Sequence, residues 1–175
     1  MTTNEQPIVN RVAQSNALRL VDLEEYYPTM PLAGFDLQPY LFAGMILKEK
    51  DFREALKTID WTQYDGKAVF IHCSADTIIP VWAYMLVSGY LKDHAVYAML
   101  GNEQALVERL MVDNVKSIDI EQLRGKKVLV KGCSDKPVPH GLYVELARML
   151  LPVVNSLMYG EACSNVPIVK SGKMS

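Results

Sequence analysis

The sequence predicts an α/β fold, with one domain whose central sheet is mainly parallel or mixed and is flanked by helices. From Asp51 onward, short continuous apolar runs alternate with apolar residues at helical spacing, which is the pattern of strands alternating with helices. Half of the 175 residues are hydrophobic, enough for one core, and no linker or low-complexity segment divides the chain. We therefore expect a single domain over residues 1–175, with 1–10 and 171–175 flexible.

The first fifty residues give the weakest pattern. Leu18–Leu23 alternates enough to predict a strand. Pro28, Pro31 and Gly34 then break the chain before Phe35–Leu37. Gln38–Lys50 fits either a helix or an extended segment, and the sequence leaves both open.

Strands and helices then alternate to near the end of the chain. Strands are predicted where apolar and β-branched residues run together, and helices where apolar residues recur every three to four positions. The predicted strands are Ala68–Ile71, Ala95–Leu100, Val128–Val130, Ser156–Glu161 and a short edge at Val166–Lys170. The predicted helices lie within Asp51–Asp60, over Val81–Gly89, around Leu106–Met111 and over Leu142–Val153. Strands joined through helices make a largely parallel sheet.

Charge and composition exclude several classes of partner. The formal net charge is -2, so there is no basic excess to neutralise the phosphates of a nucleic acid. The longest uncharged run in the middle of the chain, Thr77–Leu91, is shorter than the roughly 20 residues that span a bilayer. The polar start, residues 1–10, lacks the pattern of a secretory signal. We therefore expect a cytoplasmic protein with neither a nucleic-acid nor a membrane partner.

Two stretches of the chain share a template. Each has a Gly-Lys turn, a buried strand, Cys-Ser, a loop, a proline and a helix with tyrosine four residues beyond that proline. The first copy is Gly66–Tyr84 and the second is Gly125–Tyr143, which has one extra residue, Gly132, before its cysteine. The sequence predicts the same local structure at both places.

Three cysteines suggest a site. Cys73, Cys133 and Cys163 cannot all pair within the chain, and each lies just beyond an apolar run and is followed by serine. Because ligands of parallel α/β sheets bind outside the carboxyl ends of the strands, we expect the thiols to meet at that edge. Thiolates bind zinc, iron or an iron–sulfur cluster, and Asp76 and His140 are the candidate additional ligands. The sequence thus predicts a transition-metal or iron–sulfur protein.

Two alternatives stay open. In the first, the chain is a thiol-dependent enzyme or a sulfur carrier, with one cysteine as nucleophile and Asp76, Asp135 or His140 assisting. In the second, it is a non-catalytic interaction protein whose cysteines are buried structural residues and which associates through an exposed apolar patch. No Gly-x-Gly-x-x-Gly, phosphate loop, Gly-x-Ser-x-Gly or His-Glu-x-x-His motif assigns an enzyme class.

Further stretches carry a resemblance to a known family. They are Ile8–Ala13, Leu23–Pro28, Lys48–Arg53, Cys73–Asp76 with Trp82–Met85, Lys131–Ser134 and Gly160–Ser164. Through these stretches, which are spread over nearly the whole chain, the sequence resembles a family of small bacterial proteins catalogued only as a domain of unknown function. His140 departs from the pattern of that family. Members often lie beside genes for sulfur mobilisation and iron–sulfur assembly. The resemblance therefore implies an accessory in iron–sulfur cluster assembly with protein partners from that process, and a homo-oligomer is a further expectation.

Overall fold

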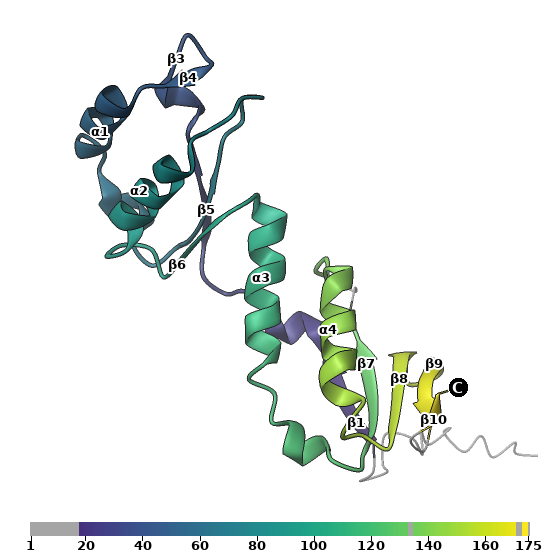
Figure 1. The fold of residues 1–175 in the computed structure, drawn as a ribbon. Coiled ribbons are helices and arrows are strands. Elements are labelled where there is room, and N and C mark those ends of the chain that lie inside the picture. The colour runs from purple at the N-terminus through teal and green to yellow at the C-terminus, as the bar shows by residue number, and fades with distance from the viewer. Residues whose placement is uncertain (1–17, 133–134, 171–172, 175) are drawn as a thin grey trace, which may run out of the picture. The chain divides into compact units, whose positions relative to one another are not determined.

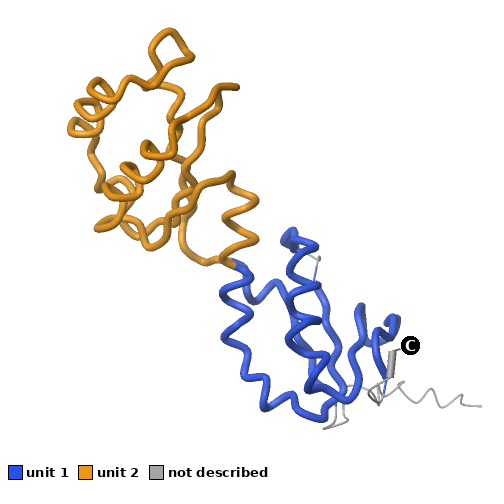
Figure 2. Tube along the Cα trace, in the orientation of Figure 1, with its two compact units in different colours: residues 1–27, 111–175 blue, residues 28–110 orange. Residues whose placement is uncertain are grey.

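The computed structural model describes residues 18–132, 135–170 and 173–174. They form four helices and sheets whose central strands are mostly parallel, which confirms the predicted α/β class (Figure 1). The chain groups into two units: unit 1 comprises residues 1–27 and 111–175, and unit 2 comprises residues 28–110 (Figure 2). Unit 2 is thus inserted into the chain of unit 1. That residues 1–175 form one domain stays a prediction. The two units are parts of the chain within that predicted domain.

Unit 1 contains a five-stranded sheet in the order β1-β7-β8-β9-β10. Its strands are β1 (Leu18–Asp22), β7 (Lys127–Lys131), β8 (Ser156–Glu161), β9 (Ser164–Lys170) and β10 (Lys173–Met174). The first three are parallel, with Leu18 opposite Lys127 and Lys127 opposite Ser156, whereas β9 and β10 add antiparallel strands. Helix α4 (His140–Leu150) connects β7 to β8 and buries Leu142, Leu146 and Leu150.

Unit 2 contains three parallel strands in the order β2-β5-β6. They are β2 (Leu32–Asp36), β5 (Ala68–His72) and β6 (Tyr97–Leu100), connected through α1 (Glu49–Lys57) and α2 (Val81–Leu91). The core under these helices is rich in aromatic rings, and Phe35 stacks on Trp61 with ring centroids 5.4 Å apart. Helix α3 (Glu103–Val115) begins in unit 2 and ends in unit 1.

Residues 38–50, for which the sequence left both a helix and an extended segment open, contain three different structures. Gln38–Tyr40 forms a short 3-10 helix, β3 (Leu41–Phe42) and β4 (Ile46–Leu47) form a hairpin, and α1 begins at Glu49. Ala43 and Gly44 lie in the hairpin turn with φ of 50° and 71°, the left-handed region that tight hairpin turns favour. Neither a continuous helix nor a continuous strand fits such a turn.

The repeated template is confirmed as repeated structure. Gly66 and Gly125 precede β5 and β7 with φ of 69° and 68°, and Pro80 and Pro139 cap α2 and α4 with nearly the same dihedral angles. Both pairs are separated by 59 residues (125 − 66 and 139 − 80). At this constant spacing Cys73 corresponds to Gly132, not to Cys133. The two loops therefore have the same length.

Candidate functional site

In unit 2, the carboxyl end of β2 is hydrogen-bonded to the loop that follows β5. Asp36, the last residue of β2, accepts hydrogen bonds from the Ser74 backbone N–H (2.9 Å), the Ser74 hydroxyl (2.5 Å) and the Gln38 backbone N–H (2.9 Å). Burial opposes ionisation of Asp36, but these hydrogen bonds, together with His72, lower its pKa. Asp36 is thus an ionised anchor for the loop that begins at Cys73.

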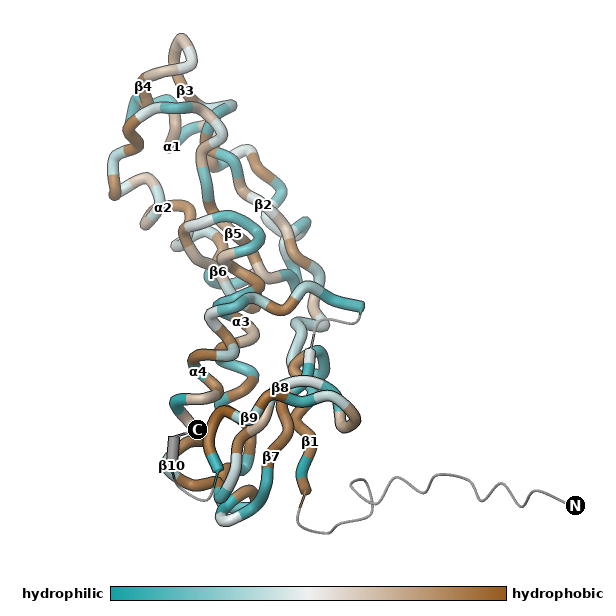
Figure 3. The backbone as a smooth tube through the Cα atoms, turned by 90° about the vertical axis from the view of Figure 1, so that its right-hand side faces the viewer, coloured by the Kyte–Doolittle hydropathy of each residue, from teal (hydrophilic) through white to brown (hydrophobic). Residues whose placement is uncertain are grey.

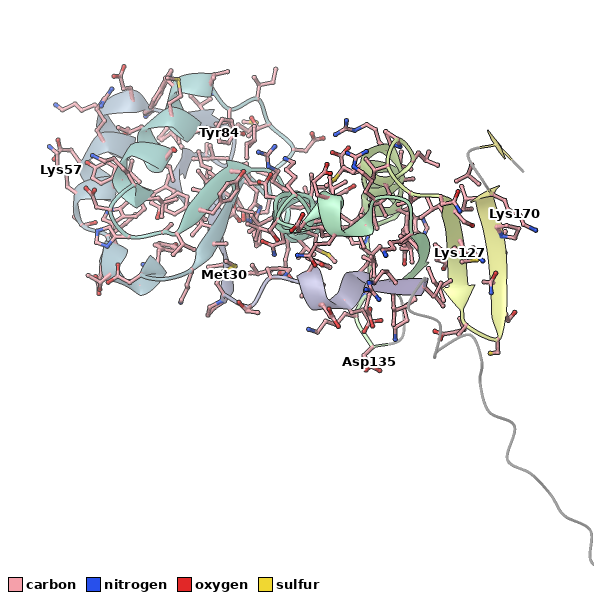
Figure 4. All side chains as sticks on the ribbon, turned by 90° about the horizontal axis from the view of Figure 1, so that it is seen from below. Met30, Lys57, Tyr84, Lys127, Asp135 and Lys170 are labelled. Carbon is pink, nitrogen blue, oxygen red and sulfur yellow. The ribbon has the colours of Figure 1, made fainter. Side chains whose placement is uncertain are left out.

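Cys73 itself lies at the margin of the core. It is half-buried and packs against the hydrophobic cluster of unit 2. Burial raises the pKa of Tyr84, which is labelled in Figure 4, and Cys73 raises it further. Asp76, farther along the same loop, is exposed. The loop therefore presents one sheltered thiol and one solvated carboxylate.

The equivalent strand ends in unit 1 carry an ion pair. Lys131 Nζ lies 2.9 Å from the Asp22 carboxylate, joining the last residue of β7 to the last residue of β1. The hydrogen bond and charge of Asp22 raise the pKa of Lys131, with smaller contributions from Glu161 and Glu24. A lysine on a buried strand is thus compensated by the carboxylates around it.

Gly132 replaces the thiol at this place in unit 1. A Cβ built on Gly132 would lie 2.8 Å from Tyr143 Oη, 3.2 Å from Val138 Cγ2 and 3.3 Å from Leu23 Cβ. No side chain larger than hydrogen fits without displacement. The two repeats therefore differ chemically where their sequences looked most alike.

The prediction of a metal or iron–sulfur site formed by Cys73, Cys133 and Cys163 is wrong. Among the described residues, no group of three or more His, Cys, Asp or Glu side chains is placed to hold a metal ion. Cys73 follows β5 in the sheet of unit 2, whereas Cys163 is exposed after β8 in the sheet of unit 1, and Cys133 lies outside the described residues. We expected these strands to share one sheet, but β5 and β8 belong to two different sheets.

A concave feature lies elsewhere, and among its lining residues His140 is the one that the sequence had pointed to as a site residue. This groove, of about 780 Å³, lies in unit 1 and is lined chiefly by residues of α4, β8 and β9. Its lining is mostly apolar: Val130, His140, Tyr143, Val144, Ala147, Arg148, Leu151, Leu157, Met158, Tyr159, Val166 and Ile168. Hydrophobic stretches along β8 and α4 are brown in Figure 3. We call this feature the α4 groove.

Side chains of the α4 groove are exposed as well as apolar. Val144 of α4 is 72% exposed and Val166 of β9 is 60% exposed, and Tyr159, Leu151 and Ile168 also reach solvent. A signal for the groove was present in the sequence. Val144, Ala147 and Leu151 lie at helical spacing beside the buried residues of α4, and Val166 and Ile168 alternate along β9. Together these patterns indicate more apolar surface than one helix–sheet contact buries.

Two basic side chains line the α4 groove. His140, the first residue of α4, is exposed and lines the groove. Arg148 also lines it, and the Arg148 guanidinium donates to both oxygens of Glu145, at 3.0 and 2.6 Å. No aspartate or glutamate is among the described lining residues. The groove thus combines an apolar floor with basic groups on its helical wall.

The comparisons with known proteins identify a family but no activity. No helix within residues 18–132, 135–170 and 173–174 has the length and apolar character needed to cross a membrane. No curated protein and no solved structure matches the chain. A family model described as "Protein of unknown function (DUF2480)" matches residues 6–171. The chain therefore belongs to this family, and the predicted resemblance to a domain of unknown function is confirmed.

Proposed function

We propose that the chain is a non-catalytic binding protein that takes up an amphipathic helix of a partner protein in the α4 groove. The observation that carries the proposal is the apolar, exposed lining of this groove between α4 and β9. Contiguous apolar surface of this kind is rare on an isolated protein and marks places of association. Helix-in-groove binding is a recurrent way to cover it.

The width of the uncovered sheet favours a helix. The sheet of unit 1 continues past β8 by two strands, β9 and β10, which Figure 1 labels beside β8. The helix that lines the groove is α4. Neighbouring strands are about 4.8 Å apart, so two strands add roughly 10 Å of width. An α-helix with its side chains is about 10 Å across, and packed helices lie about 8–10 Å apart. One further helix beside α4 fits this space.

The charge of the groove favours an acidic helix. Arg148 and His140 are the ionisable lining residues other than tyrosines. The Arg148 guanidinium is paired with Glu145, but its side chain is 70% exposed and keeps N–H donors for a second carboxylate. A helix with Leu-type residues on one face and Glu or Asp flanking them would pair with these groups at the rim. Iron–sulfur assembly proteins as the partners, and a cytoplasmic location, stay predictions.

A pair of synthetic helices tests the proposal. A fluorescein-labelled peptide of about 15 residues, with leucines at i, i+3, i+4 and i+7 and glutamates elsewhere, is titrated with the full chain and followed by anisotropy. The matched peptide carries lysines in place of glutamates. We expect the Glu peptide to bind at least about tenfold more tightly, which corresponds to about 1.4 kcal/mol.

Two variants locate the binding. Val144→Asp places a charge in the groove and should weaken binding of the Glu peptide about tenfold or more. Met85→Asp is the matched control, because Met85 lies 59 residues earlier, at the equivalent position of α2, and is similarly exposed (70%). Circular dichroism checks that both variants fold. No binding of the Glu peptide, equal affinity for the two peptides, or equal affinity of wild type and Val144→Asp for the Glu peptide would overturn the proposal.

A further inference from the structure

A second apolar surface lies on unit 2, and we infer that it binds a second copy of the chain. We call it the α2 surface. It is formed by the start of α2, the loop before it and the β3–β4 hairpin, and comprises Phe42, Met45, Ile46, Ile78, Val81 and Met85. This interaction is distinct from the α4 groove, which belongs to unit 1.

Helix α2 has an unusual composition for a helix with an exposed face. Its eleven residues, Val81–Leu91, include no charged side chain. Ala83, Val87 and Leu91 face the core, whereas Val81 is 73% and Met85 is 70% exposed. Ser88 and Gly89 continue this exposed face and are uncharged as well, and a helix without charged residues is normally buried on most sides. The exposed face of α2 is therefore expected to be covered in the functional assembly.

The loop before α2 connects this face to the hairpin. The Thr77 hydroxyl donates a 2.8 Å hydrogen bond to the Met45 carbonyl, which holds the hairpin turn against the loop. Ile78, the next residue, is 93% exposed and lies three residues before Val81. The hairpin turn is thus adjacent to the loop, and the loop leads directly into the exposed start of α2.

The fold does not require a face free of charge here, as the other repeat shows. At the constant spacing of 59 residues, the exposed Pro137 stands in place of Ile78, and His140 stands in place of Val81. Farther along the helix, α4 has Glu145 and Arg148 where α2 has a leucine and a glycine. The same local structure is thus built in unit 1 with charged groups on its helix. The uncharged face of α2 is a separate property, which folding alone does not explain.

The size and charge of the α2 surface favour a second copy as its occupant. Six large side chains exposed by 55–93% offer on the order of 700–800 Å², and a standard interface buries roughly 800 Å² per partner. None of the six is charged, and the cation in contact with them is Lys48, whose Nζ lies 3.2 Å from the centroid of the Phe42 ring, so a highly charged partner would gain little pairing there. A second α2 surface supplies an equally large and mostly uncharged area, and a twofold axis would bring the two identical surfaces together.

Sedimentation velocity of the full chain tests the inference over a range of about 1–200 μM, which spans the Kd expected of a standard-sized interface. We expect wild type to sediment as a dimer at the upper end, and Met85→Asp and Val81→Asp to sediment as monomers. Val144→Asp, at the equivalent exposed position of α4, should remain dimeric. In the peptide experiment Val144→Asp should lose binding and Met85→Asp is the control, whereas here the two variants exchange roles. A failure of the proposal for the α4 groove can therefore be distinguished from a failure of the inference for the α2 surface.

Three outcomes would overturn the inference. Wild type that is monomeric throughout the range would leave the α2 surface to a different partner. A dimer that survives Met85→Asp and Val81→Asp would place the interface elsewhere. A dimer lost equally in Val144→Asp would show that the effect is not specific to α2. Circular dichroism of each variant separates dissociation from unfolding.

Discussion

The Ser74 hydroxyl donates a 2.5 Å hydrogen bond to the Asp36 carboxylate, and this contact ties the loop after β5 to the end of the neighbouring strand β2. Two backbone N–H groups complete the arrangement, those of Ser74 and Gln38. The carboxylate therefore holds together the end of β2, the short helix that follows it and the loop after β5. Its protonation should loosen all three at once.

Asp36→Asn should lower the free energy of unfolding at pH 7 by about 1 kcal/mol, because hydrogen bonds to a charged acceptor are replaced by weaker ones. The pKa of Asp36 is lowered in the folded chain, so its contribution is present above the ordinary value of 3.8 and is lost as pH falls through the folded value. Urea unfolding at pH 7 and pH 3 measures this. The difference between wild type and variant should shrink at pH 3, whereas Asp76→Asn, an exposed carboxylate in the same loop, should change little at either pH. A difference that is the same at both pH values would contradict this role of Asp36.

Lys131→Met should change the alkaline stability of the chain. The Asp22 carboxylate raises the pKa of Lys131, so the stabilising contribution is complete below the ordinary lysine value of 10.5 and is lost as pH rises through the higher folded value. Thermal unfolding at pH 8 and above pH 10.5 measures it. Wild type should lose more of its Tm over this interval than Lys131→Met does. Lys127→Met, an exposed position on the same strand, serves as control and should follow wild type.

Two glycines should respond oppositely to alanine. Gly160 has φ of 120°, and a Cβ there would lie 2.6 Å from the Ser164 carbonyl oxygen, so Gly160→Ala should destabilise the chain by about 2 kcal/mol or more. Gly89 lies within α2 with nothing within 4 Å of a built Cβ, so Gly89→Ala should stabilise by about 0.5–1 kcal/mol. Urea unfolding of both variants gives the signs. Stabilisation by Gly160→Ala would show that the turn between β8 and β9 differs from that described.

The described cysteines should react at different rates. Cys163 is exposed in the turn between β8 and β9, whereas Cys73 is half-buried against the core of unit 2. Because access limits alkylation, N-ethylmaleimide should modify Cys163 several-fold faster. Peptide mapping by mass spectrometry at timed intervals measures both rates, and the difference should vanish in urea. Faster labelling of Cys73 in the folded chain would instead indicate an activated thiol.

The sequence predicts those elements whose apolar pattern is unambiguous. Strand β8 matches the predicted Ser156–Glu161, and β5 and β7 are each within two residues of prediction. Strand β2, Leu32–Asp36, was not predicted, because Gly34 was interpreted as a break in the chain. The apolar pattern of a strand indicates how far that strand is buried, but it does not indicate which strands share a sheet. For this reason the elements were predicted well and the grouping of their cysteines was not.

The candidate site was harder to predict than the fold. His140 was selected as a metal ligand, and the structure places it on the wall of the α4 groove. Val144 and Val166 were not selected, because an apolar residue in a helix or strand is most often part of the core. Only their exposure, which depends on how far β9 extends beyond α4, distinguishes them from buried neighbours. The spacing of Val144, Ala147 and Leu151 indicates surplus apolar surface, but which part of that surface stays exposed is a tertiary property.

The insertion of unit 2 into unit 1 imposes an order on folding during synthesis. Leu32 of β2 pairs with Ala68, which is synthesised 36 residues later (68 − 32). Leu18 of β1 pairs with Lys127, which is synthesised 109 residues later (127 − 18). The ribosome therefore completes the strands of unit 2 while β1 still lacks its neighbour. Closing the longer loop costs more entropy and is slower. A nascent chain should acquire protease resistance in unit 2 first. The residues of β1 should stay unpaired until β7 is synthesised in the last third of translation.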